Sequence, residues 1–133
     1  MAQEVLVVDD DPDLVEAVRI TLEAEGFVVS SARDGTEAKK RLAEHTPDVI
    51  LLDVMMATDT EGFDLAYELL DSPETKDIPI VMLTAMSQSQ SYIETFQQIT
   101  DRPWPVSVFL EKPISPKKLV EAIRNVLARP TRS

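Results

Sequence analysis

The sequence contains no cysteine, which excludes a disulfide framework and any metal site built on thiolates. Basic residues are scarce as well: 13 lysines and arginines stand against 24 aspartates and glutamates, and the formal net charge is −11. Such a charge argues against direct binding to nucleic acid or to an anionic membrane. No apolar stretch approaches transmembrane length and no signal-peptide pattern opens the chain, so we expect no membrane insertion and a cytoplasmic location.

The chain has the length and composition of one globular domain. It has 133 residues, of which 44% are hydrophobic, and neither an internal repeat nor a low-complexity tract interrupts it. We predict a single domain over residues 1–128 and a short polar tail over 129–133 that frays.

One apolar run stands out, residues 49–52 (Val-Ile-Leu-Leu), and Asp53 follows it directly. Four branched aliphatic residues in a row are typical of a strand that is buried on both faces in a parallel sheet. A helix is disfavoured because Pro47 lies just upstream and the run has only strand length. Open α/β sheets bind ligands at their carboxyl edge, so this pattern places the Asp53 carboxylate where a ligand would bind.

Strand and helix patterns alternate along the rest of the chain. Apolar runs predict strands over 4–8, 27–32, 49–52, 78–83 and 106–110. Apolar spacings of three and four predict helices over 12–25, from an Asp34 or Thr36 cap to 44, over 63–70 and 87–100, and from 116 onward. Asp11 and Ser115, each followed by proline, are the expected N-caps of the first and last helices, and Gly26 is the expected C-cap of the first. The alternation indicates a parallel sheet with helices on both faces. Spacing alone leaves the strand order open.

Polar residues follow the strands at the edge where their carboxyl ends would meet. Asp9 and Asp10 end the first strand, Asp53 the third and Thr84 the fourth, and Lys112 lies near the end of the fifth. Clustered carboxylates repel one another unless a cation neutralises them or one takes up a proton. Oxygen ligands alone, without histidine or cysteine, indicate a hard divalent cation, above all Mg²⁺. A carboxylate beside such a cation, with a hydroxyl and an ammonium group for phosphoryl oxygens, is equipped to form an aspartyl phosphate.

Each of these residues also has an ordinary structural interpretation. Asp53 and Thr84 are residue types that cap helices, the acids after the first strand resemble a solvated capping run, and Lys112 with the proline after it resembles a turn. The single histidine, His45, lies near a predicted helix C-terminus, where surface histidines are favoured by the helix dipole, and we assign it no chemistry. The coincidence at four strand ends favours one shared site over unrelated capping residues.

Four motifs carry a resemblance to a known family. They are Val7-Val8-Asp9-Asp10, Leu51-Leu52-Asp53-Val54-Met55-Met56, Leu83-Thr84-Ala85 and Phe109-Leu110-Glu111-Lys112-Pro113. In this combination the sequence resembles, over essentially its whole length, the receiver domain of two-component response regulators. The resemblance implies a flavodoxin-like α/β fold: a doubly wound five-stranded parallel sheet in the order 2-1-3-4-5 with five helices.

The resemblance also implies a metal site and a phosphoacceptor. Asp53 looks like the residue that accepts the phosphoryl group, and it is also one of the implied metal ligands. Asp10 matches the main Mg²⁺ carboxylate of the family, and Asp9 matches its partner, which acts mostly through water. Met55 matches the residue that lends its backbone carbonyl to the metal.

The remaining implied roles concern the phosphoryl group and the switch. Thr84 and Lys112 match the residues that hold the phosphoryl oxygens. Phe109 falls where the family keeps a rotating aromatic switch. The peptide between Lys112 and Pro113 matches the cis peptide of the family, a conformation that only proline makes cheap.

The function implied by the resemblance is that of a phosphoacceptor in a two-component phosphorelay. A histidine kinase or phosphotransfer protein would supply the phosphoryl group, and an unidentified protein partner would read altered contacts of a monomer or a phosphorylation-dependent dimer. Such a protein is not an enzyme in the usual sense, because it catalyses only its own phosphorylation and dephosphorylation. The residues suggest no direct contact with nucleic acid.

Two alternatives remain at this point. The first is a Mg²⁺-dependent phosphatase that passes through the same aspartyl phosphate. Phosphatases of the haloacid-dehalogenase type use a second carboxylate two residues after the nucleophile, and Met55 stands there. The second is a receiver-like module that binds partners without phosphorylation, against which the complete set of acids, hydroxyl and lysine argues.

The sequence departs from the family pattern in two places. The family usually has proline four residues after the acceptor, where this chain has Ala57, and the loop from there to Gly62 is longer than usual. The stretch from Thr84 to Lys112 is also longer, and Asp-Arg-Pro-Trp-Pro-Val at 101–106 replaces a frequent Gly-Ala-Asp segment. The predicted phosphorylation site is unaffected, but the role of segment 87–106 in signalling is left open.

Overall fold

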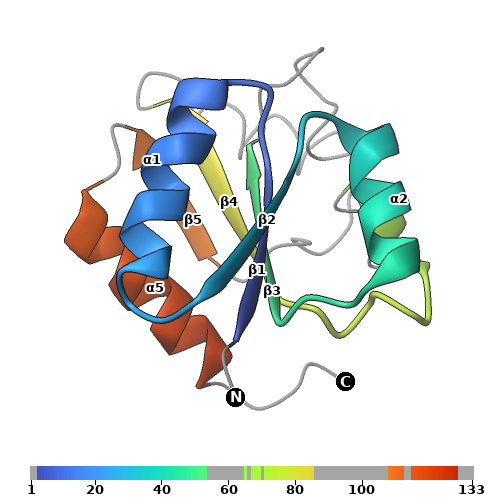
Figure 1. Ribbon diagram of the computed structural model, residues 1–133. Coiled ribbons are helices and arrows are strands. Elements are labelled where there is room, and N and C mark those ends of the chain that lie inside the picture. Colours follow the sequence, from blue (N-terminus) through green and yellow to red (C-terminus); the bar gives the residue numbers. More distant parts are fainter. Residues whose placement is uncertain are drawn as a thin grey trace.

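The structure is a computed structural model that describes residues 3–53, 65, 67–69, 71–85, 108–112 and 115–128, with the backbone alone at 84, 85, 108, 109, 111 and 112. Figure 1 shows its elements: β1 (Glu4–Val8), α1 (Pro12–Glu23), β2 (Val28–Ala32), α2 (Gly35–Glu44), β3 (Val49–Asp53), β4 (Ile80–Ala85), β5 (Val108–Lys112) and α5 (Pro116–Leu127). Residues 65, 67–69 and 71 are helical as well. Strands and helices therefore alternate from β1 to β3 as predicted.

The strands form one five-stranded parallel sheet in the order β2-β1-β3-β4-β5. Val5 is in register with Val29 of β2 and with Val49 of β3, which places β1 between these two strands. β4 pairs with β3, and β5 pairs with β4 at the other side of the sheet. This order confirms the flavodoxin-like prediction, and it brings the carboxyl ends of all five strands to one edge.

Helices cover both faces of the sheet. α1 and α5 lie on one face and α2 lies on the other (Figure 1). The core under α1 and α5 consists of Val5, Val7, Val18, Leu22, Phe27, Val49, Leu51, Val81, Leu83, Leu119, Ile123 and Val126. The core on the α2 face consists of Leu6, Val8, Ala32, Ala38, Ile50, Leu52, Leu65, Leu69, Ile78, Ile80 and Met82. Alternate strand residues thus serve opposite cores, as a sheet covered on both faces requires.

β3 is enclosed along its whole length, and all of its residues are buried, including Asp53. Leu51 has no exposed surface and packs in the core under α1 and α5. The unbroken apolar run 49–52 is therefore explained by helices on both faces of this strand.

We expect Leu51→Ala to lower the free energy of unfolding by about 2–5 kcal/mol, because it removes buried methyl groups and leaves a cavity between β3 and its covering helices. Ile20→Ala is the matched control, since Ile20 on α1 is 62% exposed and surface substitutions usually change stability by about 0.5 kcal/mol or less. Urea denaturation of both variants measures the difference. Equal losses in the two variants would contradict the burial of β3.

Two helices begin with a capping side chain followed by proline, as predicted. The Asp11 carboxylate caps α1 by accepting hydrogen bonds from the N–H groups of Asp13 at 3.0 Å and Leu14 at 3.4 Å. The Ser115 hydroxyl oxygen caps α5 by accepting from the N–H of Lys118 at 3.5 Å. In both helices proline occupies the start, where its missing N–H costs nothing.

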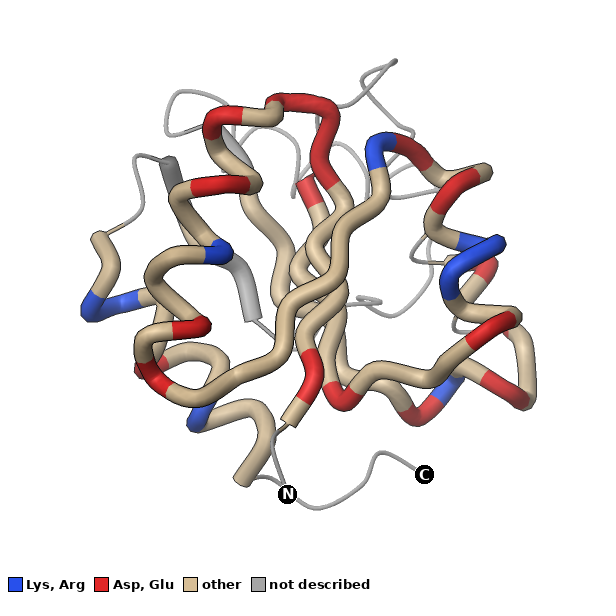
Figure 2. The backbone as a smooth tube through the Cα atoms, in the orientation of Figure 1, with Lys and Arg blue, Asp and Glu red and all other residues tan. Residues whose placement is uncertain are grey.

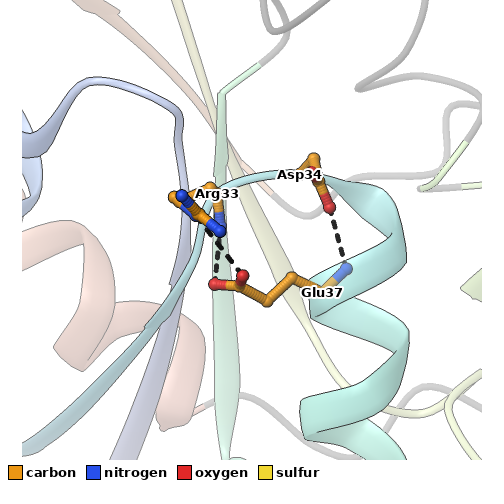
Figure 3. A network of polar contacts seen from close by, with 3 residues as sticks. All are labelled: Arg33, Asp34 and Glu37. Carbon is orange, nitrogen blue, oxygen red and sulfur yellow. Dashed lines mark hydrogen bonds and ion pairs between the residues drawn. The ribbon is translucent and has the colours of Figure 1, made fainter.

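α2 begins with a network of polar contacts that Figure 3 shows. The Asp34 carboxylate accepts from the N–H of Glu37 at 2.8 Å, so Asp34 and not Thr36 is the cap. The Glu37 carboxylate in turn accepts from the N–H of Arg33 at 3.2 Å and from its Nε at 3.4 Å. These bonds fix the turn from β2 into α2 at the carboxyl edge of the sheet.

α1 ends at Glu23, earlier than the predicted end at residue 25, and its C-cap is Ala24 rather than the expected Gly26, which lies in the turn that follows. The N–H of Phe27 bonds to the carbonyl of Leu22, and the N–H of Gly26 bonds to the carbonyl of Glu23, both at 3.1 Å. This pattern needs a left-handed residue after the helix, and Gly26 has φ 91°. A side chain at this position would be strained even though there is room for it.

Several strand boundaries differ from the predicted ones. β2 begins at residue 28 rather than 27. β4 runs from Ile80 to Ala85 rather than over 78–83. It starts late because Pro79 has no N–H to donate to the ladder, and it ends late because Thr84 and Ala85 pair with β5. β5 extends to Lys112, beyond the predicted end at 110, because pairing with Ala85 of β4 continues the strand. Sequence periodicity does not reveal such pairing.

Several predictions fall outside the described residues. They concern Met55, Ala57 and its loop, the helix over 87–100, the Lys112–Pro113 peptide and the tail over 129–133. Within the part of the chain that the structure describes, no helix combines the length and apolar character needed to span a membrane.

Candidate functional site

The predicted acidic residues meet at the carboxyl edge of the sheet. Asp9 and Asp10 follow β1, and Asp53 is the last residue of β3. Val8 is in register with Leu52, so the acids that come next on these adjacent strands leave the sheet side by side. Figure 2 shows acidic chain segments at the turn from β1 into α1 and at the end of β3, at the same end of the molecule.

The three carboxylates form a compact cluster. Asp9, Asp10 and Asp53 each offer an oxygen, and these oxygens lie within 4.8 Å of one another. Asp9 is 1% exposed and Asp53 is 3% exposed, whereas Asp10 is exposed. The cluster therefore consists of two acids set into the sheet edge and one at the surface, which gives a ligand access from solvent.

Two hydrogen bonds hold Asp9 in place, one through its backbone and one through its side chain. Its backbone N–H donates to the carbonyl of Ala32 at 3.0 Å, which continues the pairing of β1 with β2 by one residue. Its side-chain Oδ1 accepts the backbone N–H of Asp11 at 2.9 Å. The position of this carboxylate is thus tied both to the sheet and to the turn that leads into α1.

The donor set of the cluster fits a hard divalent cation. Its three side chains offer carboxylate oxygens only, and Mg²⁺ binds through one or two carboxylates together with water and phosphate oxygens. Three negative groups within 4.8 Å of one another, two of them buried, also gain from a neutralising cation. Among the described residues, no other cluster of three histidine, cysteine or acidic side chains has this spacing.

The sheet order brings the other predicted residues to the same edge. Asp53 is in register with Leu83, so Thr84 comes one position later on the neighbouring strand β4. Lys112 is in register with Ala85, one strand further on. The backbone thus arranges the acids, Thr84 and Lys112 in sequence across β1, β3, β4 and β5. Their side-chain roles remain predictions.

Phe109 lies in β5, in register with Met82 of β4. This places the predicted switch residue on the strand that carries Lys112 and beside the strand that carries Thr84. Whether its ring changes position remains a prediction.

Sequence reasoning missed the contact between the Asp11 N–H and the Asp9 carboxylate, although it identified Asp11 as a helix cap. Aspartate side chains often accept the N–H two residues further along, so this spacing was a usable signal. It also missed a contact of His45: the exposed imidazole Nε2 lies against the Glu4 carboxylate and ties the end of α2 to the start of β1. His45 is otherwise the surface residue that was expected.

Two hollows lie along α2, away from the acidic cluster. One of about 170 Å³ is bounded by Leu6, Val28, Arg41 and His45 among others. The other, of about 260 Å³, lies between Leu42 and Leu69 beside the ion pair of Lys39 and Glu68. Neither includes a predicted site residue, so the acidic cluster remains the candidate site.

Comparison with known proteins gives a family match over most of the chain. Residues 5–124 match the family described as "Response regulator receiver domain". The chain is 34% identical over 128 residues to the DNA-binding dual master transcriptional regulator RpaA of Synechocystis sp.. It is 36% identical over 129 residues to the phosphate regulon transcriptional regulatory protein PhoB of Escherichia coli.

These alignments cover 96% and 97% of this chain but only 50% of RpaA and 53% of PhoB. The chain therefore spans about half the length of these curated relatives.

Among solved structures, a putative response regulator from Chloroflexus aurantiacus superposes with a TM-score of 0.84 at 31% identity, covering 97% of this chain and 100% of that one. The similarity therefore extends through the whole fold and not only through the motifs at the strand ends.

Proposed function

This chain belongs to the response regulator receiver domain family, and on that premise we propose that it accepts a phosphoryl group on Asp53 with the help of a bound Mg²⁺. The observation that carries the proposal is the convergence of Asp9, Asp10 and Asp53 at one sheet edge. Thr84 and Lys112 follow on the next strands of the same edge. We propose that residues 1–128 form the receiver unit.

In the proposed reaction, a carboxylate oxygen of Asp53 attacks the phosphorus of a phosphohistidine on a kinase or phosphotransfer protein. The new O–P bond forms as the N–P bond of the donor breaks, and the histidine nitrogen takes up a proton. The product is an aspartyl phosphate, which water later hydrolyses. The buried position of Asp53, 3% exposed, holds its carboxylate in a fixed place for such an in-line approach.

The other site residues have supporting roles in this proposal. Asp9, Asp10 and Asp53 would hold the cation, together with the backbone carbonyl of Met55. The cation, when bound, neutralises charge that develops on the phosphoryl oxygens. The Thr84 hydroxyl donates a hydrogen bond to one phosphoryl oxygen, and the Lys112 ammonium pairs with another.

Signalling then follows from a change of protein contacts. We propose that Thr84 moves toward the phosphoryl group and that Phe109, on the neighbouring strand, changes position with it. In the cytoplasm a histidine kinase or phosphotransfer protein supplies the phosphoryl group to this chain, and a protein partner reads the altered surface of a monomer or a phosphorylation-dependent dimer. PhoB and RpaA are described as transcriptional regulators, but this chain matches only about half of each.

The test of the proposal is intact-mass measurement after incubation with acetyl phosphate, a small phosphoryl donor. We expect one acid-labile phosphoryl group per chain in the presence of Mg²⁺ and none after chelation with EDTA. An adduct of equal yield without Mg²⁺ would refute the metal-dependent mechanism. Failure to form any adduct with Mg²⁺ present would refute the phosphoacceptor function.

The same protein preparations, given an aryl phosphate ester, distinguish the receiver function from the alternative of a phosphatase. A phosphatase would release inorganic phosphate from an aryl phosphate ester over many turnovers. We expect no such turnover, since Met55 stands where haloacid-dehalogenase phosphatases have their acid/base carboxylate. Sustained release of phosphate that depends on Asp53 would favour the phosphatase over the receiver.

A further inference from the structure

The turn from β1 into α1 contains three consecutive aspartates with different surroundings. Asp9 is buried and Asp10 is exposed, and both belong to the acidic cluster. Asp11 is exposed and is not part of that cluster. Its carboxylate instead caps α1.

Asp11 connects the cluster to the helix through its own backbone. Its N–H donates to Oδ1 of Asp9 at 2.9 Å. Its carbonyl accepts the N–H of Val15 at 3.1 Å, and its carboxylate accepts those of Asp13 and Leu14 at 3.0 and 3.4 Å. The residue is therefore anchored to the first turn of α1 on one side and to the Asp9 carboxylate on the other.

The conformation of Asp11 supports this connection. Its φ of −92° and ψ of 107° are extended, which is the region that a following proline favours. Pro12 thus restricts the backbone of Asp11, and the capping bonds fix the orientation of its peptide relative to α1. Without the cap, the N–H groups of Asp13 and Leu14 lose their acceptor. Only the bond from Val15 to the Asp11 carbonyl then still ties the first turn of α1 to this residue.

We propose that Asp11 is a positioning residue for the cation site: by capping α1 it aims its own N–H at Asp9, and this bond orients the Asp9 carboxylate toward the bound cation. The inference rests on the proposed function, because it assumes a cation between Asp9, Asp10 and Asp53. It assigns to Asp11 an effect that works through hydrogen-bond geometry and not through the charge of its carboxylate.

Two substitutions of Asp11 separate the effect of its helix cap from the effect of its negative charge. Asn caps helices about as well as Asp, so Asp11→Asn keeps the cap and removes the charge. Asp11→Ala removes both. Asp34→Ala is the matched control, since Asp34 also caps a helix at the carboxyl edge through one carboxylate, and its loss likewise removes one negative charge.

The experiment is calorimetric titration of each variant of the 133-residue chain with MgCl₂, with thermal unfolding in Mg²⁺-free buffer alongside. We expect both alanine variants to unfold at lower temperature than wild type. Asp11→Ala should bind Mg²⁺ about tenfold more weakly, the lower end of the effect of removing groups that orient metal ligands. Asp11→Asn and Asp34→Ala should bind Mg²⁺ nearly as well as wild type.

The outcomes that overturn the inference are distinct from those that overturn the proposed function. Equal loss of affinity in Asp11→Asn and Asp11→Ala would show that the residue acts through its charge. Unchanged affinity in Asp11→Ala would show that the cap does not position Asp9. Absence of Mg²⁺ binding by the wild-type protein would overturn the proposed cation site, and the inference with it.

Discussion

Asp53→Asn is expected to abolish the acid-labile phosphoryl adduct that acetyl phosphate and Mg²⁺ form on the wild-type protein. The amide of asparagine has no anionic oxygen to attack phosphorus, so no aspartyl phosphate is formed. Asp53 is only 3% exposed, but asparagine is nearly isosteric with aspartate. We therefore expect the fold to persist. Intact mass spectrometry measures the yield of the adduct for both proteins.

Asp48→Asn is the matched control for this prediction, because Asp48 directly precedes β3 at the end opposite to Asp53. It is exposed, and its carboxylate accepts the N–H of Glu4 at 2.7 Å, a bond that an asparagine oxygen can replace. We expect the control to be phosphorylated like wild type. An undiminished adduct in Asp53→Asn would mean that another residue is the acceptor, and peptide mapping would then locate it.

Asp10→Asn is expected to weaken Mg²⁺ binding by at least about tenfold. The substitution replaces a carboxylate ligand by a neutral amide, and even residues that only orient metal ligands contribute about ten- to a hundredfold to metal affinity. Calorimetric titration with MgCl₂ measures the change. Asp13→Asn is the control, since Asp13 lies in the first turn of α1 outside the cluster. Unchanged affinity in Asp10→Asn would exclude it as a ligand.

The same variant should be more stable than wild type when Mg²⁺ is absent. In the wild-type protein, a carboxylate oxygen of Asp10 lies within 4.8 Å of those of Asp9 and Asp53. Because Asp10 is exposed, each such repulsion is about 1 kcal/mol or less. With Mg²⁺ at about a hundred times its dissociation constant, wild type should gain about 2.7 kcal/mol, and the variant should gain less. Thermal unfolding without Mg²⁺ tests whether the variant is more stable than wild type, and unfolding with Mg²⁺ tests whether it gains less stability from the cation.

Local sequence was sufficient for the features that depend on neighbouring residues. Asp11 and Ser115 were predicted as caps because a capping residue before proline is a local signal, and both cap helices in the structure. The buried strand was predicted from its unbroken aliphatic run, and all of β3 is buried. The strand ends then indicated which edge of the sheet the polar residues share.

Strand boundaries were predicted less well, because they depend on partners far away in the chain. β5 continues to Lys112 only because Ala85 of β4 is available to pair with it. β4 likewise continues to Ala85 because its last two residues pair with Glu111 and Lys112 of β5. The choice between Asp34 and Thr36 as a cap was likewise open until the backbone of the turn was known.

The sequence by itself determined which groups are available at the site: carboxylates, a hydroxyl and an ammonium group, each at or near the end of a predicted strand. It could not determine that Asp9 and Asp53 are neighbours, since more than forty residues separate them and spacing leaves the strand order open. The tertiary structure decided this by pairing β1 with β3, which brings their terminal acids within 4.8 Å. Helices on both faces bury the strands, and this burial, together with the order of the strands, turns separate acids into one candidate cation site.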